Sequence, residues 1–169
     1  MTAEIRELLP EESHWLKAFL YEAVFVPEGA PPPPKSVVEE PGVRVYIEDW
    51  GRPGDLCLAA LSGGQMAGAA WARVFSGDAR GYGFIDAHTP EIAVSLFKPY
   101  RAKGIGTVLM RALMKELRAA GYVRASLSVH RDNPARRLYK RLGFCTLAHK
   151  DHDELMVIDL PHNKRDNGD

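Results

Sequence analysis

The stretch Tyr100-Arg-Ala-Lys-Gly-Ile-Gly-Thr-Val-Leu-Met-Arg-Ala-Leu-Met-Lys-Glu-Leu117 joins a basic, glycine-containing turn to an amphipathic helix. Apolar residues recur at three-and-four spacing along one helical face, and Gly121 then marks the helix end: Ile105, Val108, Leu109, Ala112, Leu113, Leu117 and Ala120. Gly104 and Gly106 lack a Cβ, so the backbone can approach a ligand there, and the free N–H groups of the helix N-terminus carry partial positive charge. Arg101 and Lys103 add full charges. The turn therefore predicts an anion-binding site.

The residues around this turn separate three designs for binding phosphate. A Walker loop needs Gly-x-x-x-x-Gly-Lys-Ser/Thr, which the chain does not contain. A dinucleotide fingerprint needs Gly or Ala where Leu109 stands. The third design is a strand, a basic turn Arg101-x-x-Gly104-x-Gly106 and a helix. It fits, because residues 91–97 form an apolar run typical of a buried strand.

A second motif follows about 25 residues later. Residues 126–130 alternate as a strand, and the chain continues Arg131-Asp-Asn-Pro-Ala-Arg-Arg-Leu-Tyr-Lys-Arg-Leu-Gly-Phe144. Asn133 is a good N-cap, Pro134 suits the first helical position, and Gly143 ends the helix. Tyr139 lies on the apolar face of this short helix. It is either a core tyrosine whose hydroxyl bonds a backbone group or a functional residue.

Together the two motifs resemble the acetyl-coenzyme A signature and the Asn–Tyr–Gly-Phe hallmark of the GNAT superfamily of N-acetyltransferases. They cover about a third of the chain. The resemblance implies one α/β domain over residues 1–161, with a mixed, mostly antiparallel sheet of about seven strands flanked by about four helices. Residues 162–169 are polar, and we expect them to form a disordered tail.

The resemblance also implies a reaction, in which an acetyl group moves from acetyl-CoA to a primary amine by direct attack on the thioester. Backbone groups of Leu96 and Phe97 would bind the thioester carbonyl. Tyr139 would stabilise or protonate the leaving thiolate. The remaining expected coenzyme contacts are Arg101, Ala102, Lys103, Gly104, Ile105, Gly106, Thr107 and Asn133.

The general base is harder to predict. An alkyl amine with a pKa near 10.4 is almost entirely protonated at neutral pH, so a group must accept its proton. Glu91 opens the central strand, where some GNAT members carry a carboxylate, but it lies one residue off the usual spacing from Arg101. A β-bulge would therefore be needed to aim it inward. Asp86, His88 and His130 are alternatives, although a histidine at a strand end is more often a partly exposed structural residue.

Charge is unevenly distributed although the net charge is zero. Residues 98–150 hold thirteen Lys or Arg and two acids, whereas the remainder holds nine bases and twenty acids. A positive half would attract the coenzyme phosphates, and a negative half would concentrate a cationic amine. The basic residues lack the aromatic interleaving of a nucleic-acid site. Acidic-half candidates for the acceptor pocket are Glu22, Glu28, Asp49 and Trp50.

Composition indicates an ordinary globular protein. No apolar run approaches the length of a membrane span, and the N-terminus does not read as a signal peptide. Cys57 and Cys145 are isolated in expected strands, which suits buried residues in a reducing compartment. We therefore expect a cytoplasmic protein without a metal or membrane contact, acting on a small-molecule or peptide amine, and the sequence leaves a homodimer open. Two other functions also remain open: a coenzyme sensor without turnover, and a transferase of longer acyl groups or one acting on proteins.

Periodicity predicts the other elements. A helix is expected from residue 11 or 12 to residue 26, and a stiff loop over 29–41 contains Pro31 to Pro34. Residues 44–49 read as a helix end or a short strand. The expected strands are residues 4–8, 56–61, 66–75, 81–87, 91–97, 124–130, 144–147 and 154–160.

Overall fold

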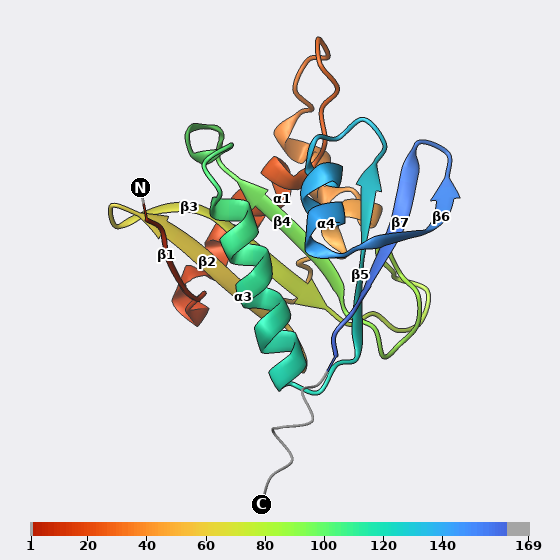
Figure 1. The fold of residues 1–169 in the computed structure, drawn as a ribbon. Coiled ribbons are helices and arrows are strands. Elements are labelled where there is room, and N and C mark those ends of the chain that lie inside the picture. The colour runs from red at the N-terminus through yellow and green to blue at the C-terminus, as the bar shows by residue number, and fades with distance from the viewer. Residues whose placement is uncertain (1, 162–169) are drawn as a thin grey trace, which may run out of the picture.

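A single seven-stranded sheet forms the centre of the molecule in the computed structural model, which describes residues 2–161 (Figure 1). The strand order is β1-β2-β3-β4-β5-β7-β6, and every neighbouring pair is antiparallel except β4 and β5. The strands are β1 (Glu4–Glu7), β2 (Leu56–Ser62), β3 (Gln65–Arg73), β4 (Glu91–Leu96), β5 (Arg124–His130), β6 (Cys145–Lys150) and β7 (Asp153–Asp159). The predicted mixed, mostly antiparallel sheet is confirmed.

Helices cover both faces of this sheet. In Figure 1, α3 and α4 lie in front of the sheet and α1 lies behind it. Four α-helices occur within residues 2–161: α1 (Leu16–Ala23), α2 (Pro41–Arg44), α3 (Ile105–Ala119) and α4 (Ala135–Leu142). Short 3-10 helices are η1 (Pro10–Trp15), η2 (Lys35–Glu39) and η3 (Lys98–Tyr100).

The sheet separates two hydrophobic cores. The larger core packs α3 and α4 against the front of the sheet, where Leu109, Leu113 and Leu117 are fully buried. The second core packs Leu16, Phe19 and Leu20 of α1 against the back of β2 and β3. Alternation along β4 follows from this arrangement: Ile92 and its even-numbered neighbours face α3, whereas Glu91, Ala93 and Ser95 face α1 and α2.

The parallel pair β4 and β5 is joined at one end only. Glu91 is registered with Ser126, and the Ser126 N–H donates to the Pro90 carbonyl at 3.0 Å. Beyond this point the strands diverge, and α4 lies in front of the widening end in Figure 1. The backbone edge of β4 from Val94 onward is therefore left without a neighbouring strand.

Two predicted elements are wrong in part. Residues 81–87 form turns and loop rather than a strand, because the Tyr82 and Gly83 N–H groups donate to the side chains of Tyr46 and Glu91 instead of to a ladder. The first helix is shorter than expected: η1 precedes α1, and the chain is already extended at Val24. Residues 44–49 continue α2 as helical turns.

Two burial predictions also fail. Val108, expected on the apolar face of α3, is 51% exposed at the margin of that face. Cys145 is exposed because β6 is an edge strand of the sheet, whereas Cys57 is buried as expected. The expected disordered tail, residues 162–169, lies outside the described residues.

Candidate functional site

The turn before α3 gathers a set of free backbone N–H groups. Ala102 and Gly104 both adopt left-handed backbone conformations, with φ of 58° and 83°, which bend the chain into a concave loop. The first helical bond runs from the Val108 N–H to the Gly104 carbonyl at 3.3 Å, so the N–H groups of Ile105, Gly106 and Thr107 have no partner inside the helix. Because α3 is 15 residues long, these donors also carry its macrodipole.

Arg101 braces this turn. Its Nε donates to the Leu96 carbonyl at 2.8 Å, and its guanidinium pairs with Glu22 of α1, also at 2.8 Å. The Arg101 guanidinium, which we expected to contact a phosphate directly, is therefore already paired with Glu22 inside the protein. Lys103 is exposed on the same turn and makes no ion pair with another residue of the 2–161 segment. Glu22, expected in an acceptor pocket, belongs to the brace instead.

The open edge of β4 lies next to the turn. The Phe97 N–H donates to Ala67 of β3 at 2.9 Å, so it is not free for a thioester carbonyl. Since neighbouring N–H groups of a strand point to opposite edges, those of Val94 and Leu96 point away from β3, toward the side where β5 has diverged. The Leu96 N–H is therefore free to bind a thioester carbonyl, as expected, and the Val94 N–H is free in the same way.

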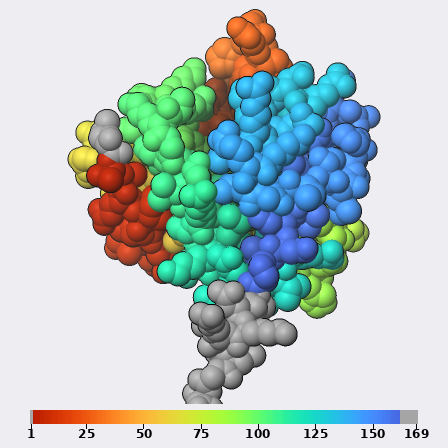
Figure 2. Space-filling model, viewed as in Figure 1, coloured from red at the N-terminus to blue at the C-terminus, as the bar shows by residue number. Residues whose placement is uncertain are grey.

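The front wall of this edge is α4. A Cβ added at Gly106 would lie 3.5 Å from Leu138 and 3.8 Å from Leu96, so this glycine lets the start of α3 pass close to both. Figure 2 shows the surfaces of the signature turn, in green, and of α4, in blue, side by side on one face. Asn133 caps α4, because its Oδ1 accepts from the Ala135 N–H at 2.9 Å, and α4 begins one residue later than predicted.

Tyr139 is buried within the front core. Its ring meets Phe144 edge to face, with centroids 5.9 Å apart. Burial raises the pKa of Tyr139, so its hydroxyl stays protonated at neutral pH. Within residues 2–161 this hydroxyl makes no hydrogen bond, and the structural alternative of a backbone-bonded core tyrosine is therefore not supported.

Glu91 lies at the opposite end of β4 and is 2% exposed. Its Oε1 accepts from the Tyr46 hydroxyl at 2.5 Å and from the Gly83 N–H at 2.8 Å, while Oε2 is buried without a hydrogen-bond partner among the described residues. Burial raises the pKa of Glu91 to about 7, against the lowering effect of those two hydrogen bonds. The expected bulge is absent: the β3–β4 register is continuous, and ordinary strand alternation directs Glu91 toward α2.

Comparison with known proteins agrees with this arrangement. The model of the acetyltransferase (GNAT) family matches residues 19–144. The chain belongs to the GNAT acetyltransferase family.

Individual relatives are more distant. A mycothiol acetyltransferase from Clavibacter sepedonicus is 34% identical over 99 residues, which are 57% of this chain and 29% of that protein. This GNAT chain thus spans less than a third of that relative. Among solved structures, the PaiA N-acetyltransferase of Thermoplasma acidophilum in complex with coenzyme A has a TM-score of 0.68 at 21% identity, covering 94% of this chain and 99% of that one. A phosphinothricin acetyltransferase of Sinorhizobium meliloti with acetyl-CoA has a TM-score of 0.66 at 19% identity, covering 98% and 92%.

The other candidate bases of this GNAT chain lie in environments unlike that of Glu91. Asp86 accepts hydrogen bonds from the His88 N–H, the Thr89 hydroxyl and Arg124, and these lower its pKa to about 2. A carboxylate held in this way is a poor proton acceptor near neutral pH. The His88 backbone supports Asp86, and the residue itself is exposed.

His130 lies at the end of β5, far from Glu91. Its ring stacks on Phe25, with centroids 4.8 Å apart, and on His152 at 5.9 Å. Its Nδ1 accepts from the Asp132 N–H at 3.1 Å. The His130 ring therefore lies on the same side of the sheet as α1. No hydrogen bond or ion pair among the described residues connects it to Glu91.

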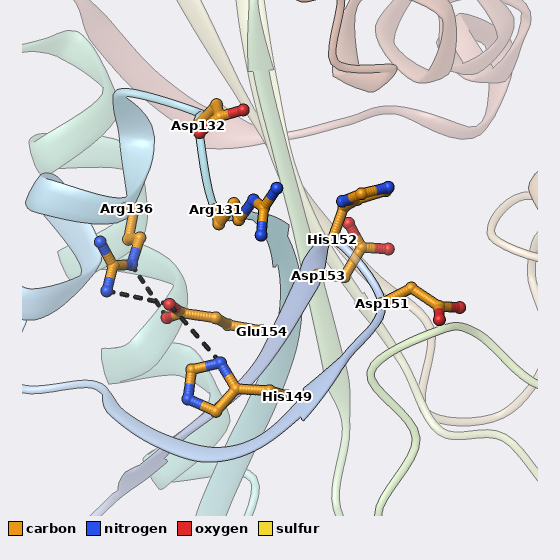
Figure 3. Close-up of a pocket in the computed structure, with 8 residues that line it drawn as sticks. All are labelled: Arg131, Asp132, Arg136, His149, Asp151, His152, Asp153 and Glu154. Atoms are coloured by element: carbon orange, nitrogen blue, oxygen red, sulfur yellow. Dashed lines mark hydrogen bonds and ion pairs between the residues drawn. The ribbon is translucent and has the colours of Figure 1, made fainter.

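A depression of about 430 Å³ lies outside this constellation, between the loop after β5 and the β6–β7 hairpin (Figure 3). Arg136 and His149 both turn toward Glu154 there, and Arg136 donates to Glu154 at 2.9 Å. Arg136, in the first turn of α4, is thus neutralised by Glu154. No group of three or more potential metal ligands, and no helix long and apolar enough to cross a membrane, occurs within residues 2–161.

The structure groups most predicted site residues into two clusters. Residues 102–107 and Leu96 lie at the diverging end of β4 beside Leu138 of α4, and Tyr139 lies in the front core next to Phe144, whereas Glu91 lies at the joined end. The sequence analysis missed Tyr46 and Val94. Strand alternation from Phe97 could have indicated Val94, but no local pattern connects Tyr46 with a carboxylate 45 positions away.

Proposed function

We propose that this chain transfers an acetyl group from acetyl-CoA to a primary amine. The observation that carries the proposal is the parting of β4 and β5, which leaves the Val94 and Leu96 N–H groups beside the free N–H cluster of α3. A strand edge can hydrogen-bond an extended amide-containing chain, and a helix N-terminus can hold a pyrophosphate. Coenzyme A contains both groups, joined in that order.

The chemistry assigns a role to each end of the site. The neutral amine nitrogen attacks the thioester carbonyl, and the Leu96 N–H stabilises the oxyanion that develops. As the C–N bond forms, the amine gives up a proton, and Glu91 accepts it through bridging water because Glu91 lies at the other end of β4 from Leu96. The C–S bond then breaks, and Tyr139 donates its hydroxyl proton or a hydrogen bond to the thiolate. A carboxyl whose pKa is about 7 is matched to this task at neutral pH.

Only the chemical class of the acceptor is proposed. Glu91 and His130 face α1 and α2, so a small-molecule or peptide amine would approach from that side of the sheet. A cytoplasmic site of action is supported by two unpaired cysteines, one of them exposed. A homodimer and the preference for acetyl over longer acyl groups also stay predictions.

The decisive experiment is a screen of amines, aminoglycoside-type antibiotics and peptides for acetyl-CoA-dependent thiol release, with mass spectrometry of the products. We expect at least one amine to give steady turnover and an N-acetylated product. A panel of longer acyl-CoA donors, tested with that amine, measures the acyl preference. Tight binding of acetyl-CoA without thiol release in the presence of any amine would contradict the proposal and favour a coenzyme sensor.

A further inference from the structure

We infer that Tyr46 is a positioning residue for the proposed base: it occupies Oε1 of Glu91, so that Oε2 is the oxygen that takes up a proton. This inference rests on the proposed function. It starts from the asymmetry of the carboxylate, because Oε1 accepts two hydrogen bonds and Oε2 accepts none from the described residues.

The Tyr46 hydroxyl is itself held in place. It donates to Glu91 Oε1 at 2.5 Å and accepts from the Tyr82 N–H at 2.8 Å. A hydroxyl with one donated and one accepted bond has its proton direction fixed. The Tyr46 ring is set against Phe75 edge to face, with centroids 5.7 Å apart. The hydrogen bond to Glu91 is therefore defined at both ends.

The backbone under Tyr46 is also fixed, by residues of β3. The Trp71 indole donates to the Tyr46 carbonyl at 3.2 Å. Arg73 donates to the Val45 and Glu48 carbonyls at 2.9 and 2.7 Å, and so satisfies carbonyls that the end of the helical turn leaves open. The buried guanidinium is neutralised by Asp55 at 2.8 Å. A buried ion pair thus supports the turn that carries Tyr46.

Glycines make room for the carboxylate on the remaining side. A Cβ at Gly81 would overlap Glu91 Oε2, and a Cβ at Gly83 would lie 2.8 Å from Oε1. Both glycines are buried, so the 81–83 loop closes over the carboxylate without a side chain between them. This packing removes most of the carboxylate from solvent, and such desolvation raises the pKa of a carboxyl toward neutral pH.

The charged and titratable groups around Glu91 are few. Tyr46 faces it from the turn after α2, and Arg73 is its cross-strand neighbour on β3, although the Arg73 guanidinium is bound to Asp55. From β5 its neighbour is Ser126, whose hydroxyl donates to the Gly83 carbonyl at 2.6 Å. From the loop it accepts a hydrogen bond from the Gly83 N–H. Tyr46 is thus the one side chain in residues 2–161 that hydrogen-bonds this carboxylate.

The test compares Tyr46→Phe with Tyr122→Phe, a control that removes the hydroxyl of a tyrosine distant from Glu91. The Glu91 carboxyl is titrated by NMR in protein carrying ¹³C-labelled glutamate, and Glu91→Gln identifies its signal. Because the lost hydrogen bond favours the carboxylate, the Glu91 titration in Tyr46→Phe should move to higher pH. The acidic limb of kcat/KM should move with it, so that turnover falls more at pH 7 than at pH 9, while the affinity for acetyl-CoA is unchanged.

Gly81→Ala provides a second variant, since its methyl group would displace Oε2. We expect kcat to fall on the order of 10-fold to 100-fold, as a misplaced reacting group does, with KM for acetyl-CoA retained. A Glu91 titration unchanged in Tyr46→Phe, or a moved titration with an unmoved kcat/KM profile, overturns the inference while acetyl transfer by the parent enzyme stands. Absence of transfer to every amine by the parent enzyme would instead overturn the proposed function, and with it this inference.

Discussion

The two ends of β4 are built to opposite requirements. At Glu91 the carboxyl is 2% exposed and closed off by glycines and Tyr46, with no cation bound to it among the described residues. At Leu96 the strand edge is open, and the exposed turn beyond it presents N–H groups and Lys103. The proposed proton acceptor needs a desolvated environment without a cation, whereas the proposed phosphate site needs accessible donors and positive charge. One strand offers both environments because β5 pairs with it only at Glu91.

Removing the proposed base, Glu91, gives the largest expected effect. Glu91→Gln keeps the size of the side chain but cannot take up a proton, so kcat should fall on the order of 100-fold to 10,000-fold, the usual contribution of general base catalysis. Binding of acetyl-CoA, measured by calorimetry, should be unchanged because the turn is at the other end of β4. Asp86→Asn is the matched control, and we expect its turnover to be retained. A Glu91→Gln enzyme with full turnover would place the base elsewhere.

Tyr139→Phe tests the leaving-group side of the open end. The ring should keep its packing against Phe144, while the thiolate loses its proton or hydrogen bond. Turnover should fall about 10-fold to 1000-fold with little change in acetyl-CoA affinity. The melting temperature should hardly change, because the hydroxyl makes no hydrogen bond to another described residue. A less stable but fully active variant would remove Tyr139 from the mechanism.

The burial of Glu91 should also make the free energy of unfolding depend on pH. The folded pKa of Glu91, about 7, is above its ordinary value of 4.5, so the folded state holds this proton more tightly than the unfolded state does. The protonated carboxyl costs nothing extra below pH 4.5, and a penalty develops as pH rises from 4.5 to about 7 and then levels off. At pH 8 the penalty approaches about 3 kcal/mol, and Glu91→Gln should relieve a large part of it.

Urea unfolding of Glu91→Gln and its parent at pH 5 and pH 8 measures this difference. Asp86 provides the opposite sign, because its lowered pKa stabilises the fold above its ordinary value of 3.8, and that contribution is lost as pH falls toward 2. Asp86→Asn should therefore destabilise the protein at pH 8. Equal stability of Glu91→Gln and its parent at both pH values would show that the carboxyl is not dehydrated as described.

Gly106 tests the open end sterically. A Cβ there would make ordinary contact with Leu138 at 3.5 Å, so Gly106→Ala should fold and bind nearly normally. The branched side chain of Gly106→Val fills the space between the start of α3 and α4. Its affinity for acetyl-CoA should fall about tenfold or more, as overpacking by 1–3 kcal/mol would produce. If calorimetry finds parental affinity in a folded Gly106→Val protein, the coenzyme does not bind at this turn.

The smallest expected effect is that of salt. The basic segment attracts phosphates over roughly 8 Å at physiological ionic strength, so coenzyme A should bind a few-fold more weakly as salt rises. Arg101 and Arg136 are neutralised by Glu22 and Glu154, which makes the effect smaller than the charge count alone suggests. Dephospho-coenzyme A should bind more weakly than coenzyme A. Affinity that stays constant from low to high salt would mean that these basic residues only solvate the surface.

Local sequence was sufficient to predict the two motif segments that are proposed to bind the coenzyme. The turn at Gly104, the helix after it and the Asn133–Gly143 segment are specified by neighbours in the chain, through caps, glycines and helical periodicity. The sequence was less informative around residues 81–87, where a strand was expected. Their backbone donors are used by Glu91 and Tyr46, which are distant in sequence, and propensity cannot report such contacts.

By itself, then, the sequence determined the family motifs and the turn and helix that are proposed to bind phosphate, because each depends on interactions within a few residues. Tertiary structure alone decided which groups are free to react. It engaged Arg101 with Glu22 and the Phe97 N–H with Ala67, left the Val94 and Leu96 edge open, and buried Glu91 under a loop against Tyr46. The physical reason is that the reactivity of a proton acceptor or a hydrogen-bond donor depends on its desolvation and its partners, and these come from segments that meet only when the chain folds.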